Sequence, residues 1–226
     1  MPTVLITGAS RGLGKELALA FSQGGYNLIL NARNKTRLEK VAYDIKTDCI
    51  ICPGDLRRED TLISLQALAQ ERGVNTLVNN AGVYWQGDFK DMPEAKLREL
   101  MEINFMAPIL LTHRVYPLMA EKGEGTIVNI NSIAGQQPNP FETAYNAGKY
   151  GLRGFTDSLR LKAESQGVRV IGFYPGTMNT KMVAGRLSPD KCMAPEKVAK
   201  MIFKICTDPD LEHITESTFH VKGELS

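Results

Sequence analysis

Residues 4–20 read VLITGASRGLGKELALA, and this stretch decides the fold. Apolar and β-branched residues come first, Gly8, Gly12 and Gly14 follow, and the last residues favour a helix. Glycines let the backbone turn tightly and approach a diphosphate closely, while a helix start offers free N–H groups and a partial positive charge. The order of strand, glycine turn and helix therefore predicts a dinucleotide site in an α/β fold.

The rest of the chain continues this alternation of short apolar runs with amphipathic stretches, which is typical of a parallel sheet covered on both faces. We expect strands at 4–7, 27–31, 49–52, 76–79, 126–131, 168–174 and 218–221. We expect helices at 12–23, 35–46, 57–72, 94–121, 144–166 and 195–206. These elements predict a single doubly wound Rossmann domain over 1–226, with a parallel sheet of about seven strands and helices on both faces.

The composition excludes several classes of function. The formal net charge is only +2 and the Lys and Arg residues are scattered, so we expect no nucleic-acid partner. No apolar run reaches the roughly 18 residues of a membrane span, and the first residues lack the pattern of a secretory signal. We therefore expect a cytoplasmic protein without a membrane partner.

The cysteine pair Cys49 and Cys52 has a spacing that occurs in metal and redox sites. The pair falls in an expected strand, where residues three apart point to opposite faces of the sheet. We therefore expect these thiols to pack in the core, and we expect no metal site.

The second expected strand ends in the sequence Asn31-Ala32-Arg33-Asn34. About 20 residues past the glycines, a carboxylate binds the ribose hydroxyls of NAD, whereas an Arg accommodates the 2′-phosphate of NADP. Arg33 can pair with that phosphate, and Arg11 can add a second positive charge. These residues favour NADP(H) over NAD(H), although Arg33 as a solvated surface residue is the alternative.

Tyr145 and Lys149 open the expected helix 144–166 and lie on one face of it, because they are four residues apart. Tyrosine is a weak base at neutral pH, but a neighbouring ammonium stabilises its phenolate, so Tyr145 can act as acid and base in turn. Ser132 follows the expected strand 126–131, at the sheet edge where ligands bind. Its hydroxyl can bond a substrate oxygen there.

These pieces together resemble the short-chain dehydrogenase/reductase family. The resemblance rests on TGASRGLG at 7–14, DL at 55–56, NNAG at 79–82, Asn104, Ser132, YNAGK at 145–149 and PGT at 175–177, in the family's order and spacing. It implies an NADP(H)-dependent oxidoreductase that acts on a small-molecule carbonyl or alcohol. It also implies a homodimer or a homotetramer.

The resemblance assigns catalytic roles to Asn104, Ser132, Tyr145 and Lys149. Pro108 has no N–H for the carbonyl of residue 104, so that carbonyl is expected to hold a water linked to Lys149. The expected cofactor-binding residues are Gly8, Ser10, Arg11, Gly12, Leu13, Gly14, Arg33, Asp55, Leu56, Asn80, Ala81, Gly82, Tyr145, Lys149, Pro175, Gly176, Thr177 and Thr180. Asn79 is expected to be mostly structural, and Asp55 to serve either the turn or the ligand.

The expected substrate pocket is fairly apolar and indicates a reductase of a ketone, an aldehyde or a 3-oxoacyl thioester. Its expected wall residues are Tyr84, Trp85, Phe141, Met178 and Met182. Two alternatives stay open, namely an NAD-dependent alcohol dehydrogenase of the same fold and a non-catalytic dinucleotide-sensing protein. The combination of Ser132, Tyr145 and Lys149 counts against a pure sensor.

Overall fold

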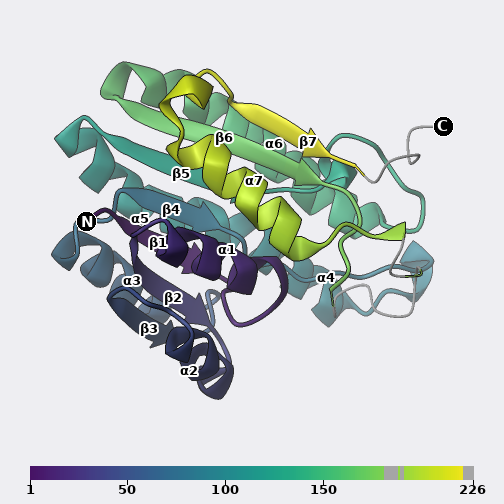
Figure 1. Cartoon of the computed structure of the whole chain (residues 1–226). Coiled ribbons are helices and arrows are strands. Elements are labelled where there is room, and N and C mark those ends of the chain that lie inside the picture. Colours follow the sequence, from purple (N-terminus) through teal and green to yellow (C-terminus); the bar gives the residue numbers. More distant parts are fainter. Residues whose placement is uncertain (181–187, 189–190, 221–226) are drawn as a thin grey trace.

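The computed structural model describes residues 1–180, 188 and 191–220 (Figure 1). Within these residues, parallel strands form one sheet with the order β3-β2-β1-β4-β5-β6-β7. The strands are β1 (Thr3–Thr7), β2 (Asn27–Ala32), β3 (Cys49–Pro53), β4 (Thr76–Asn79), β5 (Gly125–Ile130), β6 (Val168–Pro175) and β7 (Glu216–Phe219). The order reverses between β1 and β4, as in a doubly wound fold.

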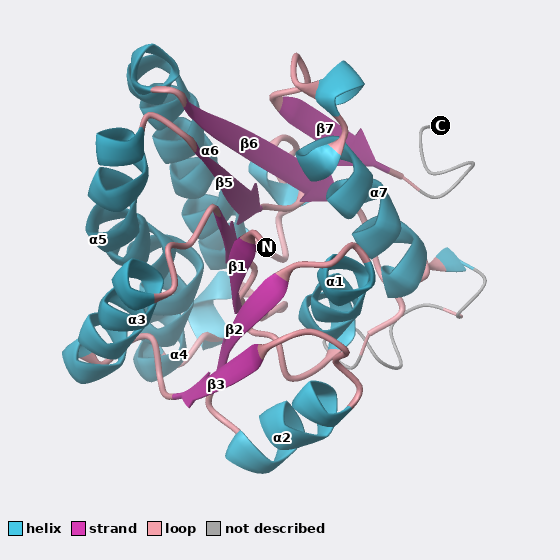
Figure 2. Cartoon of the chain, turned by 60° about the vertical axis from the view of Figure 1, so that its left-hand side comes forward, coloured by secondary structure: helices cyan, strands magenta, loops and turns pink. Residues whose placement is uncertain are grey.

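Helices cover both faces of the sheet, with α1, α2 and α7 on one face and α3 to α6 on the other (Figure 2). The helices are α1 (Gly12–Gln23), α2 (Lys35–Tyr43), α3 (Glu59–Glu71), α4 (Glu94–Met101), α5 (Ala107–Lys122), α6 (Thr143–Ala163) and α7 (Pro195–Thr207). The α/β fold class predicted from the sequence is confirmed.

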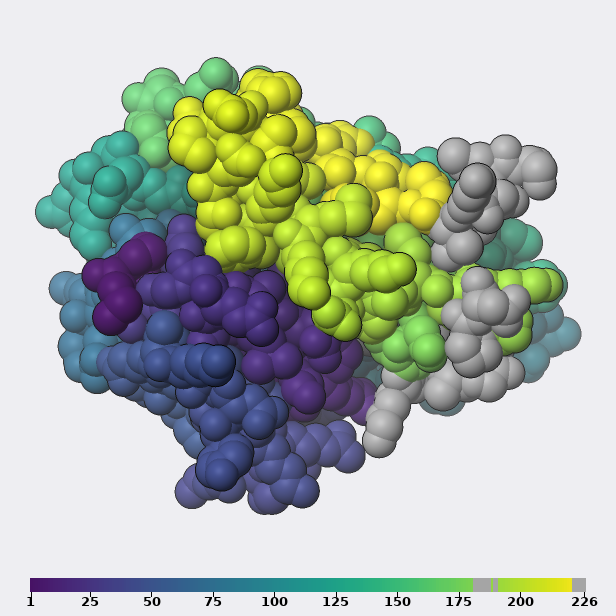
Figure 3. Space-filling model, in the orientation of Figure 1, coloured from purple at the N-terminus to yellow at the C-terminus, as the bar shows by residue number. Residues whose placement is uncertain are grey.

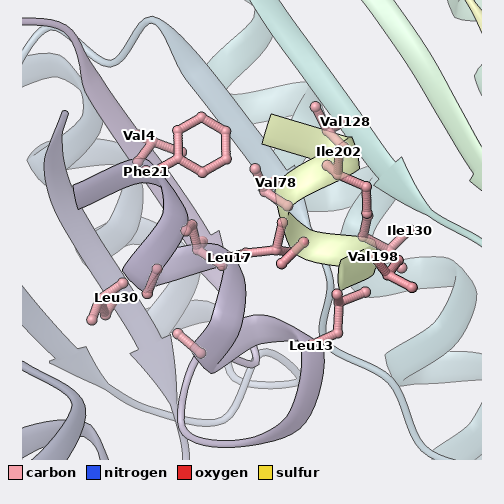
Figure 4. Packing of buried hydrophobic residues seen from close by; sticks show 14 of the residues in the cluster. Val4, Leu13, Leu17, Phe21, Leu30, Val78, Val128, Ile130, Val198 and Ile202 are labelled. Atoms are coloured by element: carbon pink, nitrogen blue, oxygen red, sulfur yellow. The ribbon is translucent and has the colours of Figure 1, made fainter. Parts of the chain in front are cut away.

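Strand β1 lies in the centre of the sheet, and all five of its residues are buried. Its side chains alternate between the two faces: Val4 and Ile6 pack in the core beneath α1 and α7, whereas Leu5 packs in the core beneath α3 and α5. Figure 4 shows Val4 in the first of these cores, together with Phe21 of α1. Each such buried side chain contributes about 1.5–3 kcal/mol to stability.

The two cysteines of β3 also separate between the faces. Cys49 packs against the core beneath α1, and Cys52 packs against the core beneath α3. Their predicted placement on opposite faces is confirmed. Burial raises the pKa of Cys49 to about 11, so its thiol stays protonated at neutral pH.

The helical prediction over 94–121 is confirmed, except that the helix contains a π-helical turn that was not predicted. Helix α4 ends at Met101, the residues Glu102–Met106 form a π-helical turn, and α5 begins at Ala107. In this turn the N–H of Ala107 bonds the carbonyl of Glu102, five residues back. Pro108 explains the π-helical turn, since it has no N–H to continue the α-helical hydrogen-bond ladder.

Smaller differences lie at element ends. The predicted strand 126–131 ends one residue earlier, at Ile130, and the predicted helix 35–46 ends at Tyr43. The last strand covers Glu216–Phe219 rather than 218–221, and Val221 lies outside the described residues.

Helix α7, from the C-terminal part of the chain, packs against α1 of the N-terminal part. Figure 3 shows its yellow-green residues directly against the purple residues of the first strand-helix unit. Phe203 of α7 packs edge-on against Phe21 of α1, with ring centres 5.2 Å apart. This packing brings the start of α7, at Pro195, to the rim of the cleft described next.

Candidate active site

A cleft of about 660 Å³ runs along the carboxyl edge of the sheet. Residues that follow β1, β2, β3, β4 and β5 all contribute to it, so it crosses the point where the strand order reverses. Of the predicted cofactor-binding residues, those lining the cleft are Gly8, Ser10, Arg11, Gly12, Leu13, Gly14, Arg33, Asp55, Leu56, Asn80, Ala81, Gly82, Tyr145, Lys149 and Thr180.

The glycine turn needs its glycines for two reasons. Gly8 and Gly12 have φ angles of +67° and +54°, a region that other residues rarely adopt. At Gly14 a Cβ atom would lie 2.3 Å from the carbonyl oxygen of Gly8. The amide of Asn80 closes the turn from β4, since its Nδ2 donates to the carbonyl of Thr7 at 2.9 Å. Helix α1 and the ends of β1 and β4 are thereby held close together.

The N-terminus of α1 opens into this cleft without a side-chain cap. Arg11 occupies the N-cap position and makes no capping hydrogen bond, and the first turn holds no acidic residue. Helix α2 differs, because the side chain of Asn34 caps it by accepting from the N–H of Arg37. An uncapped N-terminus with free N–H groups is the chemistry that binds a diphosphate.

Three of the described Arg residues line the cleft, one from the turn after β1 and two from the segment after β2. They are Arg11, Arg33 and Arg37. The Arg33 side chain is more than half exposed, and its Nη1 lies 3.6 Å from the carboxylate of Glu99 on α4. The hydrogen bond from Lys96 is the largest cause that lowers the pKa of Glu99, so this carboxylate is ionised beside Arg33.

Asp55 serves the turn after β3. Its carboxylate accepts hydrogen bonds from the backbone N–H and the side chain of Arg57, the shortest at 2.6 Å. The side-chain bond from Arg57 lowers the pKa of Asp55. Asp55 therefore does structural work while it also lines the cleft.

Lys149 of α6 is buried against the end of β5, at the wall of the cleft. Its Nζ donates to the carbonyl of Ile130 at 3.0 Å and lies 5.8 Å from the centre of the Tyr145 ring. Burial lowers the pKa of Lys149 to about 8, because it disfavours the charged form. An ammonium at neutral pH thus stands beside the phenol, as the predicted pairing of Tyr145 with Lys149 requires.

The end of β5 is locked to α6 by a second bond, from Nδ2 of Asn131 to the carbonyl of Lys149 at 3.1 Å. Ser132 comes next, and its Oγ accepts from the N–H of Ala134 at 3.2 Å, which caps a short 3₁₀ turn. Ser132 itself does not line the cleft, although its neighbour Asn131 does. Its substrate-binding role stays a prediction.

Asn104 is buried in the π-helical turn. Its side chain donates to the carbonyl of Val83 at 2.8 Å and accepts from the N–H of Val83 at 2.9 Å. This pair of bonds fixes the chain that leaves β4. The expected water relay concerns the backbone carbonyl of Asn104, and it also stays a prediction.

Three predicted cofactor residues do not line the cleft, namely Pro175, Gly176 and Thr177. The N–H of Gly176 donates to Phe219 of β7, and the carbonyl of Thr177 accepts from Met193. These residues therefore shape the loop after β6. Thr180 reaches the cleft from that loop and lies opposite Gly12, whose Cβ would be 3.4 Å from the Thr180 methyl.

The expected apolar wall is only partly present. Met178 lines the cleft, whereas Tyr84, Trp85 and Phe141 do not. Met182 lies outside the described residues. Tyr84 instead packs against Tyr145, with ring centres 4.9 Å apart.

Sequence reasoning missed several lining residues, among them Glu16, Arg37, Asn131, Asn179 and Glu196. Arg37 carried a usable signal, because it lies one turn beyond Arg33 at the start of a helix whose N-cap residue is Asn34. Asn131 also carried a signal, because it directly precedes Ser132 at the end of β5, whereas the approach of Asn179 and Glu196 depends on how distant segments pack.

Neither a metal-binding cluster nor a membrane-spanning helix is found among the described residues. Across the described parts of the chain, no cluster of three or more His, Cys, Asp or Glu side chains is arranged to hold a metal ion. In those same parts, no helix has both the length and the hydropathy of a membrane span.

The short chain dehydrogenase family model matches residues 2–191. This chain belongs to the short-chain dehydrogenase family. It is 35% identical over 199 residues to dehydrogenase/reductase SDR family member 7B of Danio rerio, covering 83% of this chain but only 64% of that protein. It thus spans less than two thirds of this relative. It is also 32% identical to the 3-oxoacyl-[acyl-carrier-protein] reductase of Synechocystis sp., covering 98% of this chain and 95% of that protein.

Solved structures show the same likeness. A short-chain dehydrogenase from Sphingobium yanoikuyae in complex with NADPH superposes with a TM-score of 0.88 at 27% identity, covering 98% of this chain and 89% of that one. A metagenomic short-chain oxidoreductase in complex with NADP gives a TM-score of 0.85 at 29% identity, covering 97% and 96%. The predicted family is confirmed, and the fold with it.

Proposed function

We propose that this chain reduces a carbonyl compound with NADPH, or oxidises the corresponding alcohol with NADP. The observation that carries the proposal is the meeting of Tyr145 and Lys149 in one cleft with the uncapped N-terminus of α1. A phenol beside a buried ammonium suits proton transfer, and the helix N-terminus suits a diphosphate.

The chain's own groups fit the parts of a bound dinucleotide. The N–H groups at the start of α1 would hold the diphosphate, and Arg33 with Arg11 and Arg37 would hold the 2′-phosphate. Lys149 would hold the ribose next to the nicotinamide. When bound, NADPH supplies the hydride that reduces the carbonyl carbon.

Tyr145 delivers the proton to the carbonyl oxygen, so that hydride and proton together convert a ketone or aldehyde into an alcohol. Lys149 keeps its positive charge near the phenol and favours the phenolate that remains. Ser132 donates to the same oxygen as negative charge develops on it. Asn104 supports the path by which Tyr145 is protonated again.

We infer NADP(H) rather than NAD(H) from the charges at the end of β2. Ala32 carries no carboxylate there, Arg33 and Arg37 of the following segment line the cleft, and Arg11 lines it from the glycine turn. The NADPH and NADP complexes of the two similar structures support the same choice.

For the substrate we propose a fairly apolar ketone, aldehyde or 3-oxoacyl thioester. Met178 and Val83 line the cleft, and the relative from Synechocystis is named as a 3-oxoacyl-[acyl-carrier-protein] reductase.

We further propose a cytoplasmic homodimer or homotetramer. Leu110 of α5 and Leu161 of α6 are exposed apolar side chains, which are available for contact with another copy.

The Tyr145→Phe variant tests the function. Turnover of a carbonyl panel, followed through NADPH absorbance, should fall at least about 100-fold because the proton donor is lost. NADPH should still bind, as measured by its fluorescence. Tyr150→Phe is the matched control, since Tyr150 lies on the same helix but is exposed and outside the cleft. Near wild-type turnover in Tyr145→Phe would refute the proposal.

A further inference from the structure

The segment 80–87, which follows β4, runs from the glycine turn to the start of α6 and is anchored along its length. Its anchors are the bonds of Asn80 to Thr7, of Val83 to Asn104, of Tyr84 to Glu142 and of Gly87 to Phe141. The first two anchors hold the cofactor side of the cleft. The last two hold the segment against the residues that precede Tyr145.

Tyr84 contacts the start of α6 in two ways. Its ring meets the ring of Tyr145 edge to face, with centres 4.9 Å apart and planes at 76°. Its hydroxyl donates a hydrogen bond to the carboxylate of Glu142. The ring contact and the hydrogen bond both act on one rigid side chain, so a large rotation of Tyr84 breaks at least one of them.

Glu142 occupies the N-cap position of α6, a position at which Ser, Thr, Asp and Asn are preferred. Its backbone carbonyl accepts from the N–H of Asn146 at 2.7 Å, as an N-cap carbonyl should. Its side chain makes no capping hydrogen bond and is directed to Tyr84 instead. Helix α6, which carries Tyr145 and Lys149, therefore has no side-chain N-cap. The side chain at its N-cap position binds Tyr84 instead.

We propose that Tyr84 is a positioning residue for Tyr145 and that Glu142 anchors it. The proposal rests on the proposed role of Tyr145 as the proton donor. The edge of the Tyr84 ring limits rotation of the Tyr145 side chain, so that the phenolic hydroxyl keeps one direction in the cleft. The backbone N–H of Gly87 donates a hydrogen bond of 2.9 Å to the carbonyl of Phe141. This bond joins the same two segments, so their separation stays fixed.

The first test needs no turnover. The protein is labelled with ¹³C at Cζ of its tyrosines, and the Tyr145 resonance is assigned from its loss in Tyr145→Phe. Tyr84→Phe and Glu142→Ala should each shift or broaden that resonance. Glu142→Gln keeps an acceptor for the Tyr84 hydroxyl, so it should leave the resonance close to its wild-type position.

The second test is kinetic. Tyr84→Phe and Glu142→Ala should each lower kcat about tenfold, within the loss of up to about 100-fold that misplacement of a reacting group causes. NADPH affinity and substrate KM should stay near wild type. The double variant should be no slower than either single variant, because both remove the same anchor. Glu142→Gln should restore most of the lost kcat.

Tyr116→Phe is the matched control. Tyr116 on α5 also donates its hydroxyl to a side chain, that of Gln166, but Gln166 follows the C-terminal end of α6, whereas Tyr145 lies at its start. This variant should change neither kcat nor the Tyr145 resonance.

An unchanged Tyr145 resonance in Tyr84→Phe and Glu142→Ala would overturn the positioning role. So would a raised KM with unchanged kcat, which would make Tyr84 a substrate contact. A wild-type protein that turns over no carbonyl would refute the proposed function, while the resonance would still decide the positioning role.

Discussion

Nζ of Lys149 lies 5.8 Å from the ring centre of Tyr145 and is held there by a hydrogen bond to the carbonyl of Ile130. Lys149 is buried, and burial lowers its pKa from 10.5 to about 8. The fold therefore keeps a positive charge beside the phenol at a cost in stability.

That cost predicts a pH dependence. Between pH 8 and 10.5 the unfolded chain binds the Lys149 proton more tightly than the folded chain does, so stability from this group rises with pH. The free energy of unfolding of wild type, relative to Lys149→Met, should rise by roughly 2–3 kcal/mol from pH 7 to pH 10. Urea denaturation of both proteins at the two pH values measures it.

Lys162→Met is the control, because Lys162 is an exposed residue of the same helix. It should show no such change with pH. A constant difference between wild type and Lys149→Met would mean that Lys149 titrates normally in the folded protein.

A second prediction concerns Arg33. Arg33→Ala should weaken NADPH binding by at least about tenfold, because a hydrogen-bonded charge pair is worth 1.5–3 kcal/mol. NADH binding should not change, since NADH has no 2′-phosphate. Arg37→Ala should act in the same direction. Fluorescence titration with each cofactor measures both, and Arg98→Ala on α4 is the control. Equal losses for NADPH and NADH would contradict the assignment of Arg33.

Much of this site could be predicted from the sequence. The strand, the glycines at 8–14 and the helix are consecutive, so local preferences already specify the dinucleotide turn. The spacing of Tyr145 and Lys149 places them on one helix face, and no distant part of the chain is needed to see it. The π-helical turn was missed, because helical periodicity continues through residues 102–106 and only Pro108 marks the break.

Other features depend on contacts between distant residues. Tyr84 and Glu142 are 58 positions apart, and only the finished sheet brings the end of β4 beside the start of α6. Glu99 meets Arg33 because α4 packs near the end of β2. No periodicity or motif in either segment records these pairings.

The contact between Glu99 and Arg33 yields a third prediction. The Glu99 carboxylate lies 3.6 Å from the guanidinium that we assign to the 2′-phosphate, so it repels that phosphate. Glu99→Gln should tighten NADPH binding by about threefold to tenfold, a gain expected for charges at such separations near a protein surface. The gain should shrink at high ionic strength and be absent for NADH.

Glu94→Gln is the matched control for Glu99. Glu94 lies on the same helix and pairs with Arg98 rather than with Arg33. Isothermal titration calorimetry of both variants measures their NADPH affinity, which should rise in Glu99→Gln and stay unchanged in Glu94→Gln. Weaker NADPH binding in Glu99→Gln would mean that Glu99 mainly orients Arg33 and that its repulsion is secondary.

The fourth prediction compares two glycines in helices. At Gly14 an added Cβ would lie 2.3 Å from the Gly8 carbonyl oxygen and 2.5 Å from Nδ2 of Asn80, so the turn and the end of β4 must separate. Gly14→Ala should lower the free energy of unfolding by about 1–3 kcal/mol and weaken binding of NADPH and NADH alike. At Gly154 of α6 nothing lies within 4 Å of an added Cβ. Gly154→Ala should stabilise by about 0.5–1 kcal/mol, because alanine loses less backbone freedom in a helix. Urea denaturation measures both, and a stable, cofactor-binding Gly14→Ala would disprove the tight packing of the turn.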